Sequence, residues 1–529
     1  MNKKVDTVYD LIVVGGGITG AGAARDAALR GLSVLLLEKG DFSSGVSSKS
    51  TRLIHGGLRY LANFELDLVA ESLRERAVIR RLVPYLVHPI PIVIPVYRGD
   101  AHGRAAISIG IHLYELLSRE KDIPHYFTWG AEKALLMEPR LARDGLKGCA
   151  VFYDHQITMP ERLVIENIIS AKYNGAVVKN YTRVEKIEER NGFVVVSARG
   201  MRSAETGEFR ARVLLNAAGP WVDMVRRSGG IDARTIIHPT KGVHLVLPKL
   251  SEQALFVSSR DGRMFFIIPL ESYSLIGTTD TRYDGDLDEV HADTPDIDYL
   301  LSESRRILPG LLLGREAILY TYAGVRPLAF SGERESSISR KHLVIKEGTN
   351  GRLITVAGGK LTTYRNMAED AVDAVCKLLG CKKRCITDTA LLPGSLPVSY
   401  DEYLKDAVAL LSSKYNAEAD TVMHLIRFYG SRAEEVLEIA HIDPGLMKRI
   451  SPETRDIYAQ VVYSVREEAA QTLADVMLRR LSIGITASRG LPYAKDIASV
   501  IAKELGWHEE ELSLNLKEFE ALVKKDRAF

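Results

Sequence analysis

The fold class is decided by one stretch near the start of the chain, Asp10-Leu-Ile-Val-Val-Gly-Gly-Gly-Ile-Thr-Gly-Ala-Gly22. It overlaps the apolar run 8–14, which suits a strand buried on both faces. The run leads into Gly15, Gly17 and Gly20 at G-x-G-x-x-G spacing. Such glycines permit a tight turn, close approach of a pyrophosphate and close packing of the next helix. We therefore predict a Rossmann-type strand, turn and helix, with the helix at about 21–30 and phosphates of a dinucleotide at its N-terminus.

A second strand is expected at 33–37, and it ends in Glu38. An acidic residue at this position accepts hydrogen bonds from a ribose diol. Because its charge would repel a 2′-phosphate, NADP is disfavoured, and FAD and NAD remain. The succession of strand, turn, helix, strand and acid is more specific than the glycine spacing alone.

Bulk composition indicates a globular enzyme. The 529 residues are 46% hydrophobic, which is enough for a large core divided into two or more domains. A net charge of +2 is too small to indicate nucleic-acid binding. No apolar run approaches the ~18 residues of a membrane span, and the first residues form no apolar signal segment. Four cysteines fit a reducing compartment, so we expect a cytoplasmic protein.

The pattern predicts an α/β fold followed by an all-helical region. Helices are expected at 64–86, 105–117 and 363–379, and antiparallel strands at 242–280. Beyond Pro393 the pattern stays helical. We expect a discontinuous unit at 8–390 and a helical C-terminal domain at 391–529. Within that unit, the dinucleotide-binding part is placed at 8–85, 150–240 and 320–380, and the substrate-binding part at 86–149 and 241–319.

Basic residues gather on glycine-flanked turns after predicted strands. Such turns are where open α/β sheets bind ligands, and Arg side chains favour phosphate or carboxylate. The loop 43–60 also carries serine hydroxyls, which can donate to a pyrophosphate, and the pair Gly56-Gly57. The pattern therefore predicts an anionic substrate beside the dinucleotide. The polar side chains concerned are Arg52, His55, Arg59, Tyr60, Arg326 and Lys360.

Several strings, in this order along the chain, resemble the FAD-dependent glycerol-3-phosphate dehydrogenases of the aerobic, quinone-linked type. The most diagnostic one contains His-Gly-Gly-Leu-Arg-Tyr. The strings are Arg52-Leu-Ile-His-Gly-Gly-Leu-Arg-Tyr-Leu, Asn216-Ala-Ala-Gly-Pro-Trp, Lys241-Gly-Val-His, Ile276-Gly-Thr-Thr-Asp, Gly324-Val-Arg-Pro-Leu and Gly358-Gly-Lys-Leu-Thr-Thr-Tyr-Arg.

The resemblance implies a glutathione-reductase-like FAD-binding domain with an inserted antiparallel-sheet substrate domain. It also implies non-covalent FAD and oxidation of sn-glycerol 3-phosphate to dihydroxyacetone phosphate. The C2 hydride would move to flavin N5, and the electrons would pass to a membrane quinone. The protein would then act as a peripheral protein on the inner face of the cell membrane.

We hypothesise roles for individual residues on this basis. The phosphate would be held by Arg59, Tyr60, Arg340 and Lys360, while Arg326 stabilises developing alkoxide charge. His244 is the expected general base and His55 the reserve, because neutral imidazole suits this task. The predicted cofactor-binding residues are Gly15, Gly17, Ile18, Thr19, Gly20, Glu38, Lys39, Ser47, Ser48, Gly56, Gly57, Ala218, Gly219, Gly359, Leu361 and Thr362.

A cluster of three cysteines and one apolar helix each allow two interpretations. The cysteines are either metal ligands or ordinary cysteines without a site. Cys376, Cys381 and Cys385 lack C-x-x-C spacing, so we expect no metal site. A helix at 104–117 places Ile107, Ile111, Tyr114 and Leu117 on one face. That face would lie either in a lipid headgroup region or against the protein core.

Two other functions remain open. An oxidase that reduces oxygen to hydrogen peroxide could use the same active site. A catalytically silent flavoprotein is the other alternative, and the basic cluster speaks against it. The sequence also leaves open whether the chain acts alone or as a homodimer.

Overall fold

The computed structural model describes residues 7–63, 65–100, 103–118, 123–231, 234–311, 313–330, 338–339 and 342–529, and its first sheet is built around β1 (Val8–Val14). β1 pairs in parallel with β2 (Val34–Leu37) on one side and with β10 (Thr206–Asn216) on the other. The strand order is β18-β19-β10-β1-β2-β7. β7 (Val177–Lys179) and β18 (Leu343–Glu347) stand at the two ends of this order, and β19 (Leu353–Ala357) lies between β18 and β10.

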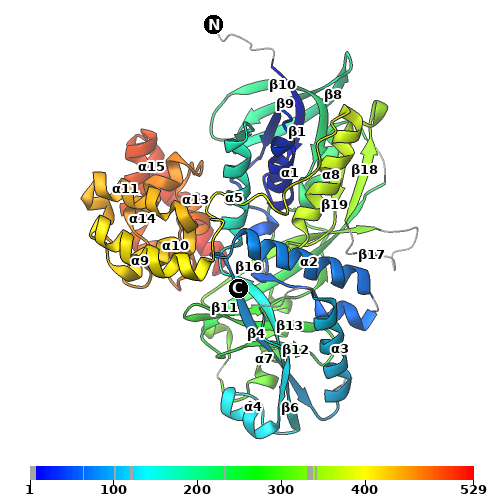
Figure 1. The fold of residues 1–529 in the computed structure, drawn as a ribbon, viewed down its shortest axis with the longest axis vertical. Helices are drawn as coiled ribbons and strands as arrows, with labels where there is room; N and C mark the ends of the chain where they lie inside the picture. Colours follow the sequence, from blue (N-terminus) through cyan, green and yellow to red (C-terminus); the bar gives the residue numbers. More distant parts are fainter. Residues whose placement is uncertain are drawn as a thin grey trace.

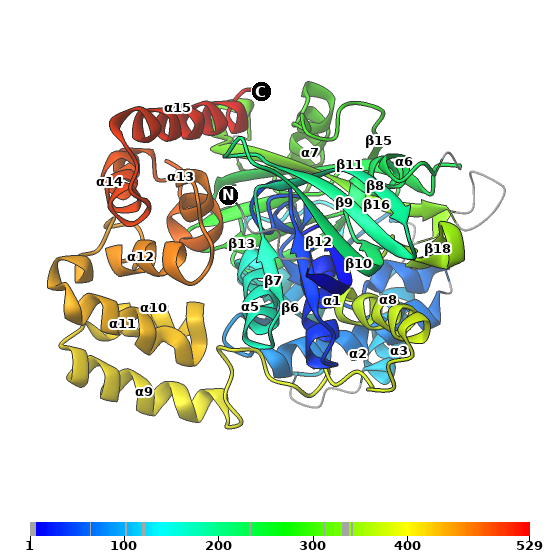
Figure 2. The same cartoon turned by 90° about the horizontal axis from the view of Figure 1, so that it is seen from above.

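Different elements cover the two faces of this sheet. Three helices lie side by side on one face: α1 (Ile18–Leu29), α5 (Pro160–Tyr173) and α8 (Tyr364–Leu379) (Figure 2). The other face packs against the antiparallel pair β8 (Thr182–Arg190) and β9 (Phe193–Gly200). Because both faces are covered, the middle of β1 is fully buried, as its continuous apolar run predicts.

The second sheet is built largely from antiparallel strands. In it, β11 (Ile237–Pro248) pairs antiparallel with β16 (Tyr320–Phe330) and with β14 (Tyr273–Gly277). This register places His244 of β11 between Gly277 and Tyr322. The other strands are β3 (Leu53–Ile54), β4 (Val87–Tyr97), β5 (Phe127–Trp129), β6 (Leu146–Ile157), β12 (Ala254–Ser258), β13 (Met264–Leu270), β15 (Thr281–Arg282) and β17 (Ile338–Ser339).

Helices surround the second sheet. They are α2 (Leu66–Leu82), α3 (Arg104–Leu117), α4 (Ala131–Met137) and α7 (Thr294–Ile307), while α6 (Val222–Ser228) follows β10. Figure 1 shows α3 and α4 at the end of the molecule remote from the N-terminus.

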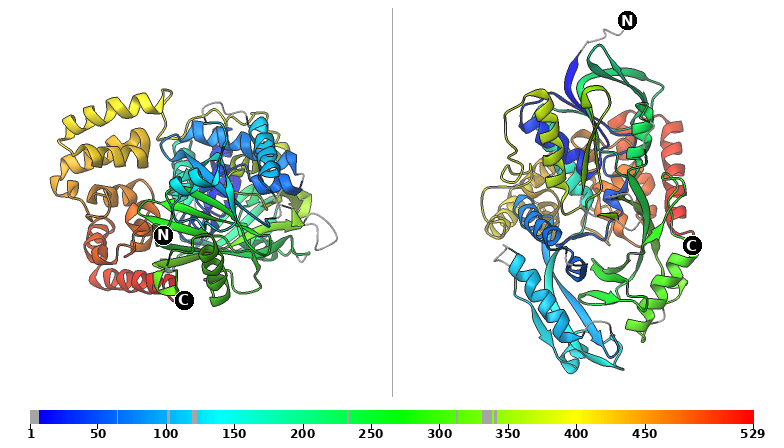
Figure 3. Two further views of the ribbon diagram at one scale, coloured as in Figure 1. Left: turned by 90° about the horizontal axis from the view of Figure 1, so that it is seen from below. Right: turned by 90° about the vertical axis from the view of Figure 1, so that its right-hand side faces the viewer.

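The C-terminal region is helical and stands to one side of both sheets (Figures 1 and 3). A buried ion pair fastens it to the loop after β2: Arg480 Nη2 lies 2.8 Å from Asp41 Oδ1, and neither side chain is exposed. Arg162 and Glu468 form a second buried contact of 2.7 Å. The helices are α9 (Tyr400–Tyr415), α10 (Ala419–Tyr429), α11 (Ala433–Ile442), α12 (Tyr458–Arg466), α13 (Leu473–Asp475), α14 (Ala494–Leu505) and α15 (Glu509–Asp526).

The predicted fold class is confirmed, and strand pairing refines the expected division of the chain. The ranges 150–240 and 320–380 were expected to be dinucleotide-binding. Most of β6 falls in the first range and all of β16 in the second, yet both strands pair in the second sheet. Both strands contact antiparallel neighbours that sequence periodicity alone does not identify. The chain already enters the second sheet at β3 and returns to the first sheet only at β7 and β18, so the changes of sheet fall at other positions than the predicted ranges give.

The face of α3 selected from the sequence faces the core. Ile111 and Tyr114 are 0% and 2% exposed, because they pack with residues of the second sheet. The exposed apolar side chains of this helix are instead Ile109 and Leu116, at 71% and 75% exposure. The headgroup interpretation of the original face is thus wrong. No helix among the described residues is both long and apolar enough to cross a bilayer.

Candidate functional site

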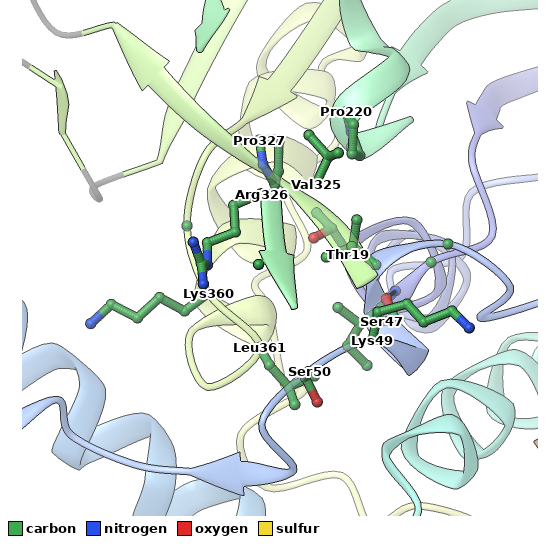
Figure 4. Close-up of a pocket in the computed structure, with 18 of the residues that line it drawn as sticks. Thr19, Ser47, Lys49, Ser50, Pro220, Val325, Arg326, Pro327, Lys360 and Leu361 are labelled. Carbon is green, nitrogen blue, oxygen red and sulfur yellow. Dashed lines mark hydrogen bonds between the residues drawn. The ribbon is translucent and has the colours of Figure 1, made fainter. Parts of the chain in front are cut away.

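A cavity of about 920 Å³ lies between the two sheets, at the carboxyl ends of β1 and β2. Its volume is at the upper end of the range for small-molecule and cofactor sites. Figure 4 shows Arg326 and Lys360 on one side of it and Thr19 and Ser47 on the other. The cavity therefore joins the glycine turn of the first sheet to Lys360 on the turn after β19 and to Arg326, which lies within β16 and not on the turn expected from the sequence.

The glycine turn after β1 leaves space for a ligand next to backbone amides. Gly15 has φ +109°, and a Cβ there would lie 2.6 Å from the carbonyl oxygen of Ala217. Gly17 immediately precedes α1, and a Cβ on it would extend toward Ser47 Oγ, 3.3 Å away. Ser47 Oγ accepts a hydrogen bond of 3.0 Å from the Ile18 amide. Because a helix N-terminus attracts negative charge, this cradle fits a pyrophosphate.

Glu38 occupies the position expected of a ribose acceptor. Its Oε2 accepts a hydrogen bond of 2.6 Å from the Gly16 amide, and its Oε1 accepts one of 2.8 Å from the Gly40 amide. Burial raises the pKa of the Glu38 carboxyl above its usual value, although the two amide donors oppose that shift. The two amides fix the carboxylate at the end of β2, where it lines the cavity. The turn and this acid together fit a dinucleotide cofactor.

His244 is the buried imidazole of the site, with 2% of its surface exposed. Its Nε2 lies 3.0 Å from Thr51 Oγ1, and its ring stacks on Tyr322 with a centroid separation of 4.9 Å. Burial and the nearby Arg326 and Arg52 guanidinium groups lower the pKa of His244 to about 3. The ring is therefore neutral at pH 7.

Arg326 is held at the cavity wall by three contacts from the segment that follows β14. Its Nη1 lies 2.9 Å from Asp280 Oδ1, and its Nη2 donates to Thr278 Oγ1 at 2.9 Å and to the Thr279 carbonyl oxygen at 2.8 Å. The guanidinium also lies over Gly242, where a Cβ would come within 2.5 Å of Nη2. The cation thus has a fixed orientation before any ligand binds.

The third basic side chain, Lys360, lies on the turn after β19. Its Nζ donates to Ser72 Oγ at 2.9 Å and lies 4.1 Å from the ring centroid of Tyr60. The neighbouring Thr362 fastens this turn to the loop of His55, since its Oγ1 accepts from the His55 amide at 3.1 Å. These contacts bring two predicted turns, far apart in sequence, to the same cavity.

Most of the residues predicted from the sequence line the cavity. Arg52, Gly20, Ser48 and Gly56 do not line it. The buried Arg52 donates instead to the Thr158 carbonyl oxygen, Gly20 packs α1 against the turn, Ser48 donates to the Gly45 carbonyl oxygen, and Gly56 lies against Tyr114. Arg340 and the side chain of Arg59 lie outside the described residues. The lining residues are Gly15, Gly17, Ile18, Thr19, Glu38, Lys39, Ser47, His55, Gly57, Tyr60, Ala218, Gly219, His244, Arg326, Gly359, Lys360, Leu361 and Thr362.

Sequence reasoning missed several lining residues. Thr51 and Thr278, whose hydroxyls contact His244 and Arg326, lie within or beside strings already singled out, so their proximity was a usable signal. Phe256 and Phe266 stack at 4.5 Å and line the cavity, but their strand pattern is that of ordinary core residues.

The four cysteines are free thiols and none of them lines the cavity. Within the described ranges, no group of three or more His, Cys, Asp and Glu residues is arranged to hold a metal ion.

Comparison with known proteins gives consistent matches along the chain. Residues 10–365 match the family model of FAD dependent oxidoreductases, and residues 385–512 match that of the C-terminal domain of alpha-glycerophosphate oxidase. A glycerol-3-phosphate dehydrogenase of Synechocystis sp. is 40% identical over 98% of this chain and 97% of the relative. An aerobic glycerol-3-phosphate dehydrogenase of Staphylococcus epidermidis is 34% identical over 99% and 95%. The X-ray structure of the glycerol-3-phosphate dehydrogenase from Bacillus halodurans complexed with FAD has a TM-score of 0.83 and 30% identity, covering 99% of this chain and 96% of that one.

Proposed function

This chain belongs to the FAD-dependent glycerol-3-phosphate dehydrogenase family, and on that premise we propose that it oxidises sn-glycerol 3-phosphate to dihydroxyacetone phosphate. FAD is its cofactor. The observation that carries the proposal is the convergence of Arg326, Lys360 and His244 on the cavity that begins at the glycine turn. A phosphate dianion with a secondary alcohol needs cations at one end and a proton acceptor at the other.

The phosphate is assigned to Lys360 and Tyr60, together with Arg59 and Arg340. Lys360 supplies the positive charge. Its Nζ lies 4.1 Å from the ring centroid of Tyr60, so a cation–π interaction holds it there. Arg326 is assigned to the reacting end, since its fixed guanidinium would stabilise negative charge that develops on the alcohol oxygen.

His244 is assigned as general base, with His55 as the reserve. Its neutral ring accepts a proton, but a pKa of about 3 makes it a weak base before substrate binds. A bound phosphate dianion offsets the cations that depress this pKa and so strengthens the base. Thr51 holds Nε2 at 3.0 Å and keeps the ring oriented. FAD, when bound, supplies the acceptor for the hydride that leaves substrate C2.

The electron acceptor is proposed to be a membrane quinone. Ile109 and Leu116 on α3 and Leu136 on α4 are 71%, 75% and 77% exposed, and they lie on the substrate-binding side of the molecule. With Arg104 at the start of α3, they are assigned to contact with a headgroup layer from the cytoplasmic side. We expect the protein to pellet with anionic lipid vesicles, and an Ile109→Glu and Leu116→Glu double variant to pellet less. Leu410→Glu, at an equally apolar position of α9 with 66% exposure, is the control. Equal pelleting of all three proteins would contradict this contact.

The reaction itself is tested by its products. Under nitrogen, with a quinone analogue, one dihydroxyacetone phosphate should form per acceptor reduced, and glycerol should give none. Peroxide formed in air at the same rate as quinone reduction would favour the oxidase instead. Absence of dihydroxyacetone phosphate with either acceptor would refute the proposed substrate.

A further inference from the structure

The segment 283–291, here called the strap, connects β15 to α7 and passes along one part of the flavin cavity. Leu287, Asp288 and Val290 of the strap line the cavity, as do Glu38 and Trp221 from the first sheet and its loops. Because the acid at the end of β2 receives a ribose in this fold, the strap borders the adenosine half of the site.

An ion pair joins the middle of the strap to the loop that follows β2. Lys39, the residue after Glu38, pairs with Asp288, and its Nζ lies 4.1 Å from the ring centroid of Trp221. The two charged side chains are 34% and 47% exposed. The pair therefore bridges the two sheets across the rim of the cavity.

The outer side of the strap is tied to the C-terminal domain. Glu289 pairs with Lys525 in the last turn of α15, whose end lies toward α7 in Figure 2. That end of the helix is itself anchored: Asp526 accepts from Arg489 at 3.0 Å, and its carbonyl oxygen accepts from Thr321 of β16 at 3.2 Å. The C-terminal domain thus reaches a segment that lines the flavin cavity.

Both ends of the strap are fixed independently of these two bridges. Tyr283 donates from its amide to the Pro239 carbonyl oxygen at 3.0 Å. At the other end Lys241 lies 2.6 Å from Asp293 and 2.8 Å from Asp296. Since the ends stay anchored, loss of either ion pair would free only the middle, where Leu287 and Val290 face the cavity.

We propose that the strap retains the adenosine half of FAD, and that α15 braces it through Lys525. In this role the helical C-terminal domain contributes to cofactor retention, a task separate from substrate oxidation. The inference depends on the flavin site and not on the identity of the substrate.

The test is the rate at which the holoenzyme releases FAD after dilution, followed by the rise in free-flavin fluorescence without substrate. Each exposed pair should contribute little, so Asp288→Asn and Lys525→Met are each expected to speed release about two- to five-fold. The controls are Lys524→Met, at an exposed lysine next to Lys525, and Asp284→Asn, which removes a local pair between the strap and Arg282 of β15. The controls should release FAD at the parental rate.

A charge-reversed variant, Glu289→Lys with Lys525→Glu, should restore the parental rate. Release by Lys525→Met at the rate of the Lys524→Met control would overturn the bracing role. Release by Asp288→Asn at the control rate would overturn the retention role. Because no substrate is present, a failure to oxidise glycerol 3-phosphate would leave these rates unaffected.

Discussion

Replacing Arg326 by methionine removes a guanidinium while keeping most of the side-chain bulk. Three contacts of 2.8–2.9 Å hold this group in place, so its charge is fixed before the reaction. A fixed donor of this kind contributes about 10²–10³-fold to kcat, or ~2.7–4 kcal/mol, and we expect kcat to fall by that factor. Asp280, which loses its contact with Arg326, is 33% exposed, so stability should change by less than ~1 kcal/mol.

The same variant makes a second, independent prediction. Arg326 is one of the cations that lower the pKa of His244, so its removal raises that pKa. A general base is active when deprotonated, and the acid limb of kcat/KM must therefore move to higher pH. The assay is anaerobic flavin reduction by stopped flow across pH, with the exposed Arg282→Met as control. A loss below about tenfold in kcat, or an acid limb shifted to lower pH, would refute the assigned role.

Three further predictions concern the base, the cofactor turn and the helical domain. His244→Asn should lower kcat about 10²–10⁴-fold with FAD content unchanged, and a larger loss in His55→Asn would move the base assignment to His55. Gly15→Ala should weaken FAD binding by the apoprotein at least about tenfold. The backbone at φ +109° and the close contact of a new Cβ with Ala217 cost ~1–3 kcal/mol. Gly103→Ala is the control: it has open space around the new Cβ and should bind FAD normally. Asp41→Asn should lower the free energy of unfolding by ~3 kcal/mol at pH 7, since burial is outweighed by Arg480 and Arg479, which hold the pKa of Asp41 below its usual value. That stability is present above pH ~4 and is lost as pH falls through the folded-state pKa, so the difference in Tm between the two proteins must shrink in acid; a constant difference would count against the ion pair.

The cofactor turn could be predicted because local sequence determines it. Gly15, Gly17 and Glu38 act through backbone geometry and strand ends that are close in the chain. The basic cluster was accessible in part: Lys360 lies on a turn after β19, as expected, whereas Arg326 lies within β16, opposite Thr240 of β11, and not on a turn. The role of each of these side chains stays a prediction.

Contacts between distant segments could not be predicted in the same way. Ile111 and Tyr114 are buried because they pack against the second sheet. The periodicity of the apolar residues alone does not decide whether their face of α3 is buried or exposed. The bridges of Asp41 to Arg480 and of Glu289 to Lys525 join residues hundreds of positions apart. No local pattern marks such pairs, so the connection of the helical domain to the cofactor site appears only in the fold.

The account as a whole rests on a flavin that receives electrons from glycerol 3-phosphate in this cavity. The most direct measurement is the flavin absorbance spectrum of the purified protein under anaerobic conditions. Addition of sn-glycerol 3-phosphate should bleach the oxidised flavin band, while glycerol or inorganic phosphate should leave it unchanged. A bound flavin that stays yellow in saturating glycerol 3-phosphate would contradict the central claim.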